Sequence, residues 1–525
     1  MRKATSACPP YLPQYLFRFK HIEDKQGKFS CKFQSNKLIF PRSYTKSTAM
    51  SRITRETADG MRWMLLQKCT LQPVTLVYSM VLARLLSKEE MGLMGLTAIF
   101  FTAAGTLAAG GFGNALIRKQ DRTAEDADTL FWFNLGMGLL IALLFFLSAP
   151  WLAAFFEAPP LCKLVQASAL IVLLNSATNV HMAHYMARRQ FKVPALICLG
   201  SALVAMPLCL LLAWQGWGVW AYMVQGCASA VLTAVLFWCI CPWRPRFRFS
   251  RRSFRELAPL GCRLAATGLL DTAYIHARAF FIGKVYSPAA LAGYKNGAQL
   301  AAMCPTVLCY MLDQITFPIL STLQGSPQKL TGVYRRYMRL FTLPIAWLCL
   351  FTAAFAGPLV RVCYGPGWEE CVPYLQILSI SYATWHLQII NLNLLKAGGP
   401  PKLFLRLELI KKCLGIAILI GMFFISVLAI CWGALATSAL CLTINTWATR
   451  RYMHLPARQH LLDWLPGFAL AAACTWLPAL LLSELAPLPR LAAGLALSLS
   501  LYLGILRFAA PGALRDAWGI LRRRS

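Results

Sequence analysis

The chain has 525 residues, of which 58% are hydrophobic and 14% are charged, whereas about a quarter of the residues are charged in an ordinary soluble domain. The apolar residues gather in repeated runs of about 20 residues, each long enough to cross a bilayer as a helix, so the sequence predicts a polytopic membrane protein and excludes a large soluble catalytic domain. The formal net charge is +32, from 52 Lys and Arg against 20 Asp and Glu. We attribute this charge to membrane topology and to contact with anionic membrane lipids, and we predict no nucleic-acid partner.

Residues 1–49 differ from the rest of the chain, because they are polar, basic and rich in Ser, Lys and Phe. They lack the apolar core and the small-residue cleavage site of a secretory signal. Met50 begins a short basic lead-in to the first apolar run. We therefore expect Met50 to be the functional start, with residues 1–49 as a non-native extension; a disordered cytoplasmic tail is the alternative.

Fourteen apolar stretches follow, and we predict a membrane-spanning helix for each of them. The approximate bounds are 63–86, 91–117, 129–156, 161–186, 193–214, 218–241, 254–282, 291–320, 337–356, 372–395, 407–428, 432–448, 461–482 and 491–507. Clusters of Lys and Arg precede the first stretch and follow every even-numbered one, while the other connections carry few cations. Because cations are retained on the cytoplasmic side, this alternation places both termini in the cytoplasm.

The chain also repeats itself weakly. Residues 83–92 and 283–293 both leave an apolar stretch with a cation, turn at a serine, and enter the next stretch through an apolar residue and a glycine. The offset of about 200 residues covers six stretches, an even number, so the two copies have the same orientation in the membrane. The sequence therefore predicts an all-α fold with two six-helix lobes, 50–250 and 251–456, followed by two added helices and a basic tail in 457–525.

The first copy of this repeat carries a family resemblance. Residues 82–93, Leu-Ala-Arg-Leu-Leu-Ser-Lys-Glu-Glu-Met-Gly-Leu, resemble the opening of polysaccharide flippases of the Wzx type, which belong to the multidrug, oligosaccharidyl-lipid and polysaccharide exporter superfamily. The resemblance continues in 111–118 and 187–192 and is strongest between 317 and 378. It looks closest to the branch that exports colanic-acid-like and teichuronic-acid-like repeat units. These diffuse motifs identify a family better than a substrate.

The resemblance implies a transporter of the bacterial cytoplasmic (inner) membrane that works by alternating access of its two lobes. The cargo would be a short oligosaccharide on an isoprenoid diphosphate of the undecaprenyl type, and other polysaccharide assembly proteins would be partners. No cofactor is implied, and coupling to protons or to sodium ions is left open. Such a cargo requires a polar cleft inside the bilayer, because each buried unpaired hydroxyl costs several kcal/mol, and it requires cations for the diphosphate.

Ionisable residues inside apolar stretches usually face a cavity, and here they concentrate in the seventh and eighth stretches. On a helix the following seventh-stretch residues fall within an arc of roughly 80°: Arg263, Thr267, Asp271, Tyr274 and Arg278. We assign Arg278, Arg263 and Tyr274 to substrate binding, because a guanidinium fork suits phosphate. Asp271 is either the ion-pair partner of Arg278 or a coupling site. Two alternatives stay open: a pair that only neutralises itself, and an Arg263 side chain that reaches the cytoplasmic surface. The family usually carries an acidic residue near Arg278, so the coupling role is not carried over to this position.

Two residues of the eighth stretch complete the candidate site. Lys295 is either a phosphate contact near the outer side or an interfacial anchor, and Asp313 is a candidate gate or proton site near the inner side. Eighteen residues separate them, about 27 Å along a helix, so they cannot touch each other.

Metal and disulfide chemistry receive little support from the sequence. Most of the 19 cysteines lie in apolar runs, and no pair of CxxC motifs occurs, so we interpret them as small core residues. Cys363 and Cys371, eight positions apart in an outer connection, could close a disulfide. His181 and His184 lie one helical turn apart without obvious further ligands, so no metal site is predicted.

Two other functions compete with the flippase interpretation. A cation-coupled multidrug extruder could use the same fold. A membrane-bound polysaccharide polymerase or ligase would need carboxylates, histidines or metal ligands in a sizeable loop, and the connections here are short. We therefore predict that the protein is not an enzyme and has no catalytic residues.

Overall fold

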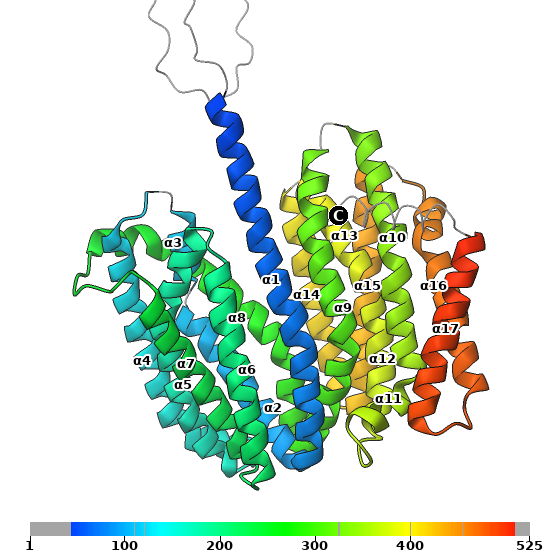
Figure 1. Ribbon diagram of the computed structural model, residues 1–525, viewed down its shortest axis with the longest axis horizontal. Coiled ribbons are helices and arrows are strands. Elements are labelled where there is room, and N and C mark those ends of the chain that lie inside the picture. Colours follow the sequence, from blue (N-terminus) through cyan, green and yellow to red (C-terminus); the bar gives the residue numbers. More distant parts are fainter. Residues whose placement is uncertain are drawn as a thin grey trace, which may run out of the picture. The chain divides into compact units, whose positions relative to one another are not determined.

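The computed structural model of the protein describes residues 44–109, 111–119, 121–323, 326–398, 401–453 and 455–509, and these residues contain helices and no strand (Figure 1). The helices are α1 Tyr44–Leu85, α2 Lys88–Ala109, α3 Phe112–Arg118, α4 Ala124–Phe155, α5 Pro160–Ala187, α6 Lys192–Trp214, α7 Val219–Ile240, α8 Arg251–Val285, α9 Pro288–Thr322, α10 Pro327–Ala354, α11 Ala356–Cys363, α12 Cys371–Ala383, α13 Trp385–Gly398, α14 Pro401–Phe423, α15 Val427–Met453, α16 Ala457–Leu481 and α17 Pro487–Ala509. The chain divides into two units, residues 1–55 and residues 56–525, each with its own internal contacts. The packing described below is that of the second unit. The expectation that Met50 is the functional start concerns residues that lie mostly outside the described part of the chain.

Among the described helices, ten are long and apolar enough to cross a membrane: α2, α4, α5, α6, α7, α9, α10, α15, α16 and α17. The prediction of an all-α polytopic membrane protein is therefore confirmed. The other expected spans correspond to α1, α8, α14 and the consecutive pair α12 and α13. The count of fourteen spans stays a prediction.

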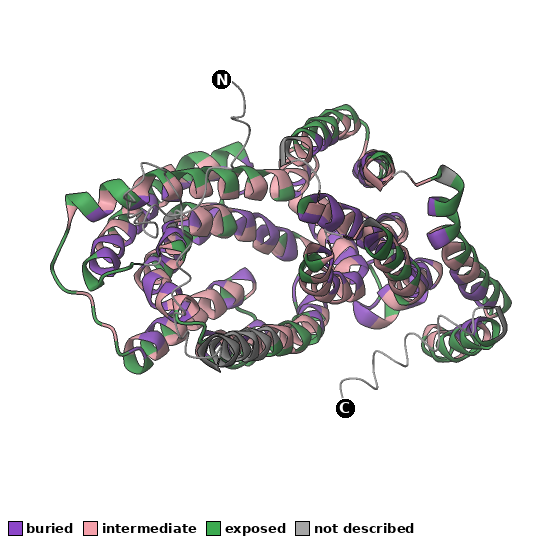
Figure 2. Ribbon diagram, turned by 90° about the horizontal axis from the view of Figure 1, so that it is seen from above, coloured by how far each residue is buried: buried purple, intermediate pink, exposed green. Residues whose placement is uncertain are grey.

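The surface of these helices suits lipid. On α4 the exposed side chains include Leu139, Leu143, Leu147 and Trp151, which recur every four residues and so share one helical face. Figure 2 shows this division, with buried faces turned toward neighbouring helices and exposed faces turned outward. A continuous apolar face of this kind favours contact with hydrocarbon over contact with water.

Two expected spans are interrupted. The stretch 91–117 is split into α2 and α3 at Gly111, whose φ is +66°, a value that favours glycine. A Cβ atom at Gly111 would lie 2.7 Å from the backbone nitrogen of Ala265, so α8 also approaches too closely for any other residue. The stretch 372–395 is split at Thr384, whose hydroxyl lies 3.1 Å from the Ser381 carbonyl oxygen and 2.9 Å from the Ser438 hydroxyl. Such side-chain bonds compete with the helical ladder.

The first lobe is built on α4 and α5, which pack along each other, with α7 against α5 and α6 against α7 (Figure 1). In the second lobe α9 packs on α10, α12 and α13, and α14 packs on α15. The lobes meet where α2 packs on α8 and α9. The lobe boundaries at residues 250 and 456 stay predictions.

The two copies of the sequence repeat have the same local structure and touch each other. Ser87 and Ser287 each accept a hydrogen bond from the backbone N–H three residues later, at 3.2 Å and 3.0 Å, and so cap the starts of α2 and α9. A Cβ atom at Gly92 would lie 1.9 Å from the Pro288 carbonyl oxygen. The glycine of the first copy therefore allows the two helix starts to pack backbone against backbone.

A polar group attaches α16, the first of the two added helices, to the second lobe. Asp463 on α16 is buried and accepts hydrogen bonds from Arg335 at 2.7 Å and from Arg339 at 2.8 Å, both on α10. Tyr334 of α10 lies 2.8 Å from the His460 ring of α16. Because the carboxylate and both cations are paired, the contact can be buried without a large electrostatic penalty.

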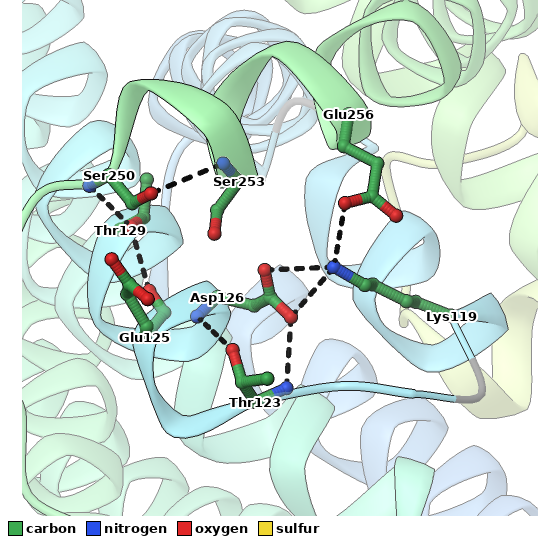
Figure 3. Close-up of polar contacts among 8 residues, drawn as sticks. All are labelled: Lys119, Thr123, Glu125, Asp126, Thr129, Ser250, Ser253 and Glu256. Atoms are coloured by element: carbon green, nitrogen blue, oxygen red, sulfur yellow. Dashed lines mark hydrogen bonds and ion pairs between the residues drawn. The ribbon is translucent and has the colours of Figure 1, made fainter.

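A second polar group joins α4 to the start of α8 (Figure 3). Lys119 lies between Asp126 and Glu256, at 2.9 Å and 3.0 Å. Asp126 also closes a capping box with Thr123 at the start of α4. Burial alone would lower the pKa of Lys119, but its hydrogen bonds to the two carboxylates outweigh burial and raise the pKa, so the lysine stays charged.

Replacing Asp126 by alanine is expected to destabilise the protein by about 2–3 kcal/mol, because it removes the capping box and leaves Lys119 without its buried partner. The side chain of Asp126 is 1% exposed, whereas that of Glu256 is 58% exposed. Glu256→Ala is therefore the matched control, with an expected loss below about 1 kcal/mol. Thermal unfolding of the purified protein in detergent measures both, and equal losses would contradict the prediction.

The thiols of Cys363 and Cys371 are free, so the disulfide considered from the sequence is wrong. Cys363 ends α11 and Cys371 begins α12. Both side chains are buried in the main hydrophobic cluster, where packing accounts for them.

Candidate functional site

The candidate site is centred on Arg278, which lies in the last third of α8 and is partly buried. The guanidinium lies beside the phenol of Tyr294 on α9 and within electrostatic reach of Tyr274 and Tyr382. Among the described residues no carboxylate forms an ion pair with Arg278. A cation lined by tyrosines in an apolar helix retains its capacity to bind an anion.

The carboxylate of Asp271 forms an ion pair with Lys412 on α14. One of the two interpretations from the sequence paired Asp271 with Arg278, since both residues lie on one side of α8. The structure differs because α14 packs beside α8 and brings a lysine to the carboxylate from 141 residues away. Because Asp271 is paired with Lys412, its carboxylate does not compete with an anionic ligand for Arg278.

The sequence-based site does not include the polar residues of α14, because Lys411 and Lys412 fit the pattern of cations that follows the tenth apolar stretch. Lys411 is buried and is bonded to Glu408 and, at 3.0 Å, to Asn445 of α15. Lys411 and Lys412 lie three and four residues after Glu408, so all three side chains are on the same side of α14. Their position beside an apolar run was the signal that could have indicated a polar face inside the second lobe.

The other two predicted residues of α8 lie apart from Arg278. Arg263 is exposed and lies about four turns before Arg278 along the helix. Tyr274 lies on the same side as Asp271 and packs toward α14, since a Cβ atom at Gly415 would lie 2.5 Å from its hydroxyl oxygen. The structure thus brings Tyr274 toward Arg278 and Asp271 but leaves Arg263 outside this group.

The two predicted residues of α9 have partners within the protein. The ammonium of Lys295 donates to the Gly95 carbonyl oxygen of α2 at 3.2 Å, a bond between the lobes. Asp313 accepts a hydrogen bond from Asn393 of α13 at 2.9 Å. Lys295 therefore stabilises the contact between the lobes in this conformation, and Asp313 belongs to the interior of the second lobe.

Several further bonds join the lobes near Lys295. Lys88 pairs with Glu370 at 2.6 Å, and the Trp368 indole donates to the Ala83 carbonyl oxygen at 3.2 Å. Gln299 donates to the Ser79 hydroxyl at 2.9 Å. All of these bonds lie near the α1–α2, α8–α9 and α11–α12 connections. The lobes are therefore held together at one end of their helices.

No group of three or more His, Cys, Asp and Glu side chains that could hold a metal ion occurs in the described ranges. The arrangement instead combines an available guanidinium, a paired carboxylate and a closed contact between two lobes. Such an arrangement, in a protein of apolar helices, suits the binding of an anionic ligand between two lobes of a membrane protein.

Solved structures share this fold. The structure resembles that of the lipid II flippase MurJ in an inward closed conformation, with a TM-score of 0.66 at 10% identity, covering 85% of this chain and 99% of that one. It also resembles an inward-facing multidrug resistance transporter of the MATE family, with a TM-score of 0.54 at 13% identity, covering 74% of this chain and 98% of that one.

Residues 81–373, more than half of the chain, match the family described as polysaccharide biosynthesis protein, and the chain belongs to that family. It is 22% identical over 319 residues to the succinoglycan biosynthesis transport protein ExoT of Rhizobium meliloti, covering 61% of this chain and 65% of that protein. It is 22% identical over 333 residues to the lipopolysaccharide biosynthesis protein WzxC of Escherichia coli, covering 62% and 67% respectively. The chain thus spans about two thirds of the length of these curated relatives.

Proposed function

We propose that this protein moves a lipid-linked oligosaccharide, carried on an isoprenoid diphosphate of the undecaprenyl type, across the bacterial cytoplasmic membrane. The observation that carries the proposal is Arg278, a cation in a membrane helix with tyrosines around it and no carboxylate partner among the described residues. A diphosphate is the part of such a cargo that needs a cation. The family, the transport role of ExoT, the biosynthetic role of WzxC and the MurJ-like fold support the same function.

In a transporter that works by alternating access, the contact between the lobes would act as a gate at one end of the cleft. If both termini are cytoplasmic, as the charge pattern predicts, the bonds of Lys88, Lys295 and Trp368 close the outer end. Arg278 would then receive the diphosphate from the cytoplasmic side, and these bonds would break when the cargo leaves. The Asp271–Lys412 pair and Asp313 are the groups through which a proton or sodium gradient could act, and other polysaccharide assembly proteins would receive the product.

Reconstitution tests the proposal. Full-length protein in liposomes should make a fluorescent undecaprenyl diphosphate oligosaccharide, placed in the inner leaflet, accessible to an external lectin. Liposomes loaded with ethidium should retain it. Ethidium efflux without lipid turnover would support a multidrug extruder instead. A change in the mass of the oligosaccharide would support a polymerase or ligase.

A further inference from the structure

A cavity of about 270 Å³ lies inside the first lobe between α2, α5 and α7, apart from the Arg278 site. Its polar lining comes from Asn175 on α5 and from four residues of α7, namely Tyr222, Gln225, Ser229 and Thr233. The α7 residues recur at intervals of three or four positions, so they form one stripe along the helix. Asn175, Gln225, Ser229 and Thr233 lie in the middle part of their expected spans, whereas Tyr222 lies four residues after the start of its span.

The five polar side chains of this cavity have hydrogen-bonding capacity that the described residues do not use. No hydrogen bond joins any of them to a described residue. Hydroxyls elsewhere in the same lobe behave differently, since Ser168 and Ser176 of α5 donate to the carbonyl oxygen four residues earlier, at 2.6 Å and 2.8 Å. All five are partly or fully exposed, so their donors and acceptors are open to a ligand that enters the cavity.

The lining specifies the chemistry of the occupant. No charged residue lines the cavity within the part of the chain that the structure describes, so this lining offers nothing to neutralise a phosphate. Hydroxyl and amide groups both donate and accept, as the hydroxyls of a sugar do. Phe101 and Tyr222 add aromatic surface on which the apolar face of a sugar ring can pack. The volume lies just below the range of ~300–1,000 Å³ of sites for drug-sized ligands, so one sugar ring suits it better than a whole oligosaccharide.

The cavity lies next to a part of α2 that contacts α8. Gly105 of α2 lines it, and the hydroxyl of the next residue, Thr106, lies 3.1 Å from that of Thr272, the neighbour of Asp271 on α8. We infer that this cavity binds a neutral glycosyl unit of the cargo while the diphosphate binds Arg278. The inference rests on the proposed function and divides the recognition of one cargo between the lobes, with hydrogen bonds in the first and charge in the second.

Two binding probes test this division in the full-length protein in lipid nanodiscs: undecaprenyl diphosphate alone, and undecaprenyl diphosphate that carries one glucose. The first variant is Gly105→Leu, because a Cβ atom at Gly105 meets nothing within 4 Å and the leucine would extend into the cavity. The second is Gln225→Leu, which keeps the bulk and removes the amide. Each should weaken binding of the glucosyl probe about tenfold, the effect of one or two lost hydrogen bonds, and leave binding of the bare diphosphate unchanged.

Gly136→Leu on α4 is the matched control, since Gly136 is also in open space, is exposed and does not line the cavity. It should bind both probes as the unchanged protein does. Equal weakening for both probes in Gly105→Leu, or no weakening in either variant, would overturn the inference and leave the proposed function standing. An unchanged protein that binds neither probe would instead overturn the proposed function, and this inference with it.

Discussion

Export of the lipid-linked oligosaccharide is expected to fall at least ~100-fold when Arg278 is replaced by alanine, which corresponds to about 3 kcal/mol of lost interaction with the diphosphate. The abundance of the protein in the membrane should not change, because Arg278 is only partly buried and no described carboxylate depends on it. Turnover in liposomes, normalised to the amount of inserted protein, measures the effect. Normal turnover in Arg278→Ala would refute the site.

Arg278→Lys is the conservative control for this position. It keeps the charge but loses the planar fork that holds phosphate with two bonds, so turnover should be partly retained. Arg263→Ala provides a second comparison on the same helix. Because Arg263 is exposed and lies outside the Arg278 group, its replacement should have a much smaller effect.

The ion pair between Asp271 and Lys412 can be tested by combining substitutions. Since Asp271 pairs with Lys412, the effects on stability of Asp271→Ala and Lys412→Ala should be coupled, by about 0.5–1 kcal/mol because both side chains are partly exposed. The effects of Asp271→Ala and Arg278→Ala should add independently. Coupling of Asp271 to Arg278 rather than to Lys412 would restore the pair that the sequence alone suggested.

Replacing Gly92 by alanine is expected to separate the two lobes at their closed end. The added Cβ atom would lie 1.9 Å from the Pro288 carbonyl oxygen and 2.2 Å from its carbon, and backbone atoms cannot rotate away as a side chain can. We expect a destabilisation of about 1–3 kcal/mol and a turnover below about a tenth of normal, because the closed contact would be lost. Thermal unfolding in detergent and liposome turnover measure the two effects.

The same substitution at Gly136 is the control for Gly92, since a Cβ atom there meets nothing within 4 Å. Gly136→Ala should leave unfolding and turnover unchanged. A Gly92→Ala protein with normal stability and normal turnover would show that the start of α2 does not need to touch the start of α9.

The sequence by itself determined the class of the protein and much of its local structure. Apolar runs predicted the membrane helices, because the length needed to cross hydrocarbon is a property of each run alone. The repeat around Ser87 and Ser287 predicted two equivalent helix starts, because a serine caps a helix through bonds to residues only three positions away. The family followed from the same local motifs.

Only the tertiary structure decided which polar groups meet. The partner of Asp271 is Lys412, and Lys295 bonds to the backbone of α2, so each contact depends on the rotation and crossing of helices that lie far apart in the chain. The break at Gly111 likewise depends on how closely α8 approaches, and the cavity beside Gln225 exists only because α2, α5 and α7 meet around it. Hydrophobic periodicity fixes which face of a helix is polar, but charge pairs and cavities form between helices, and their geometry is set by packing over the whole fold.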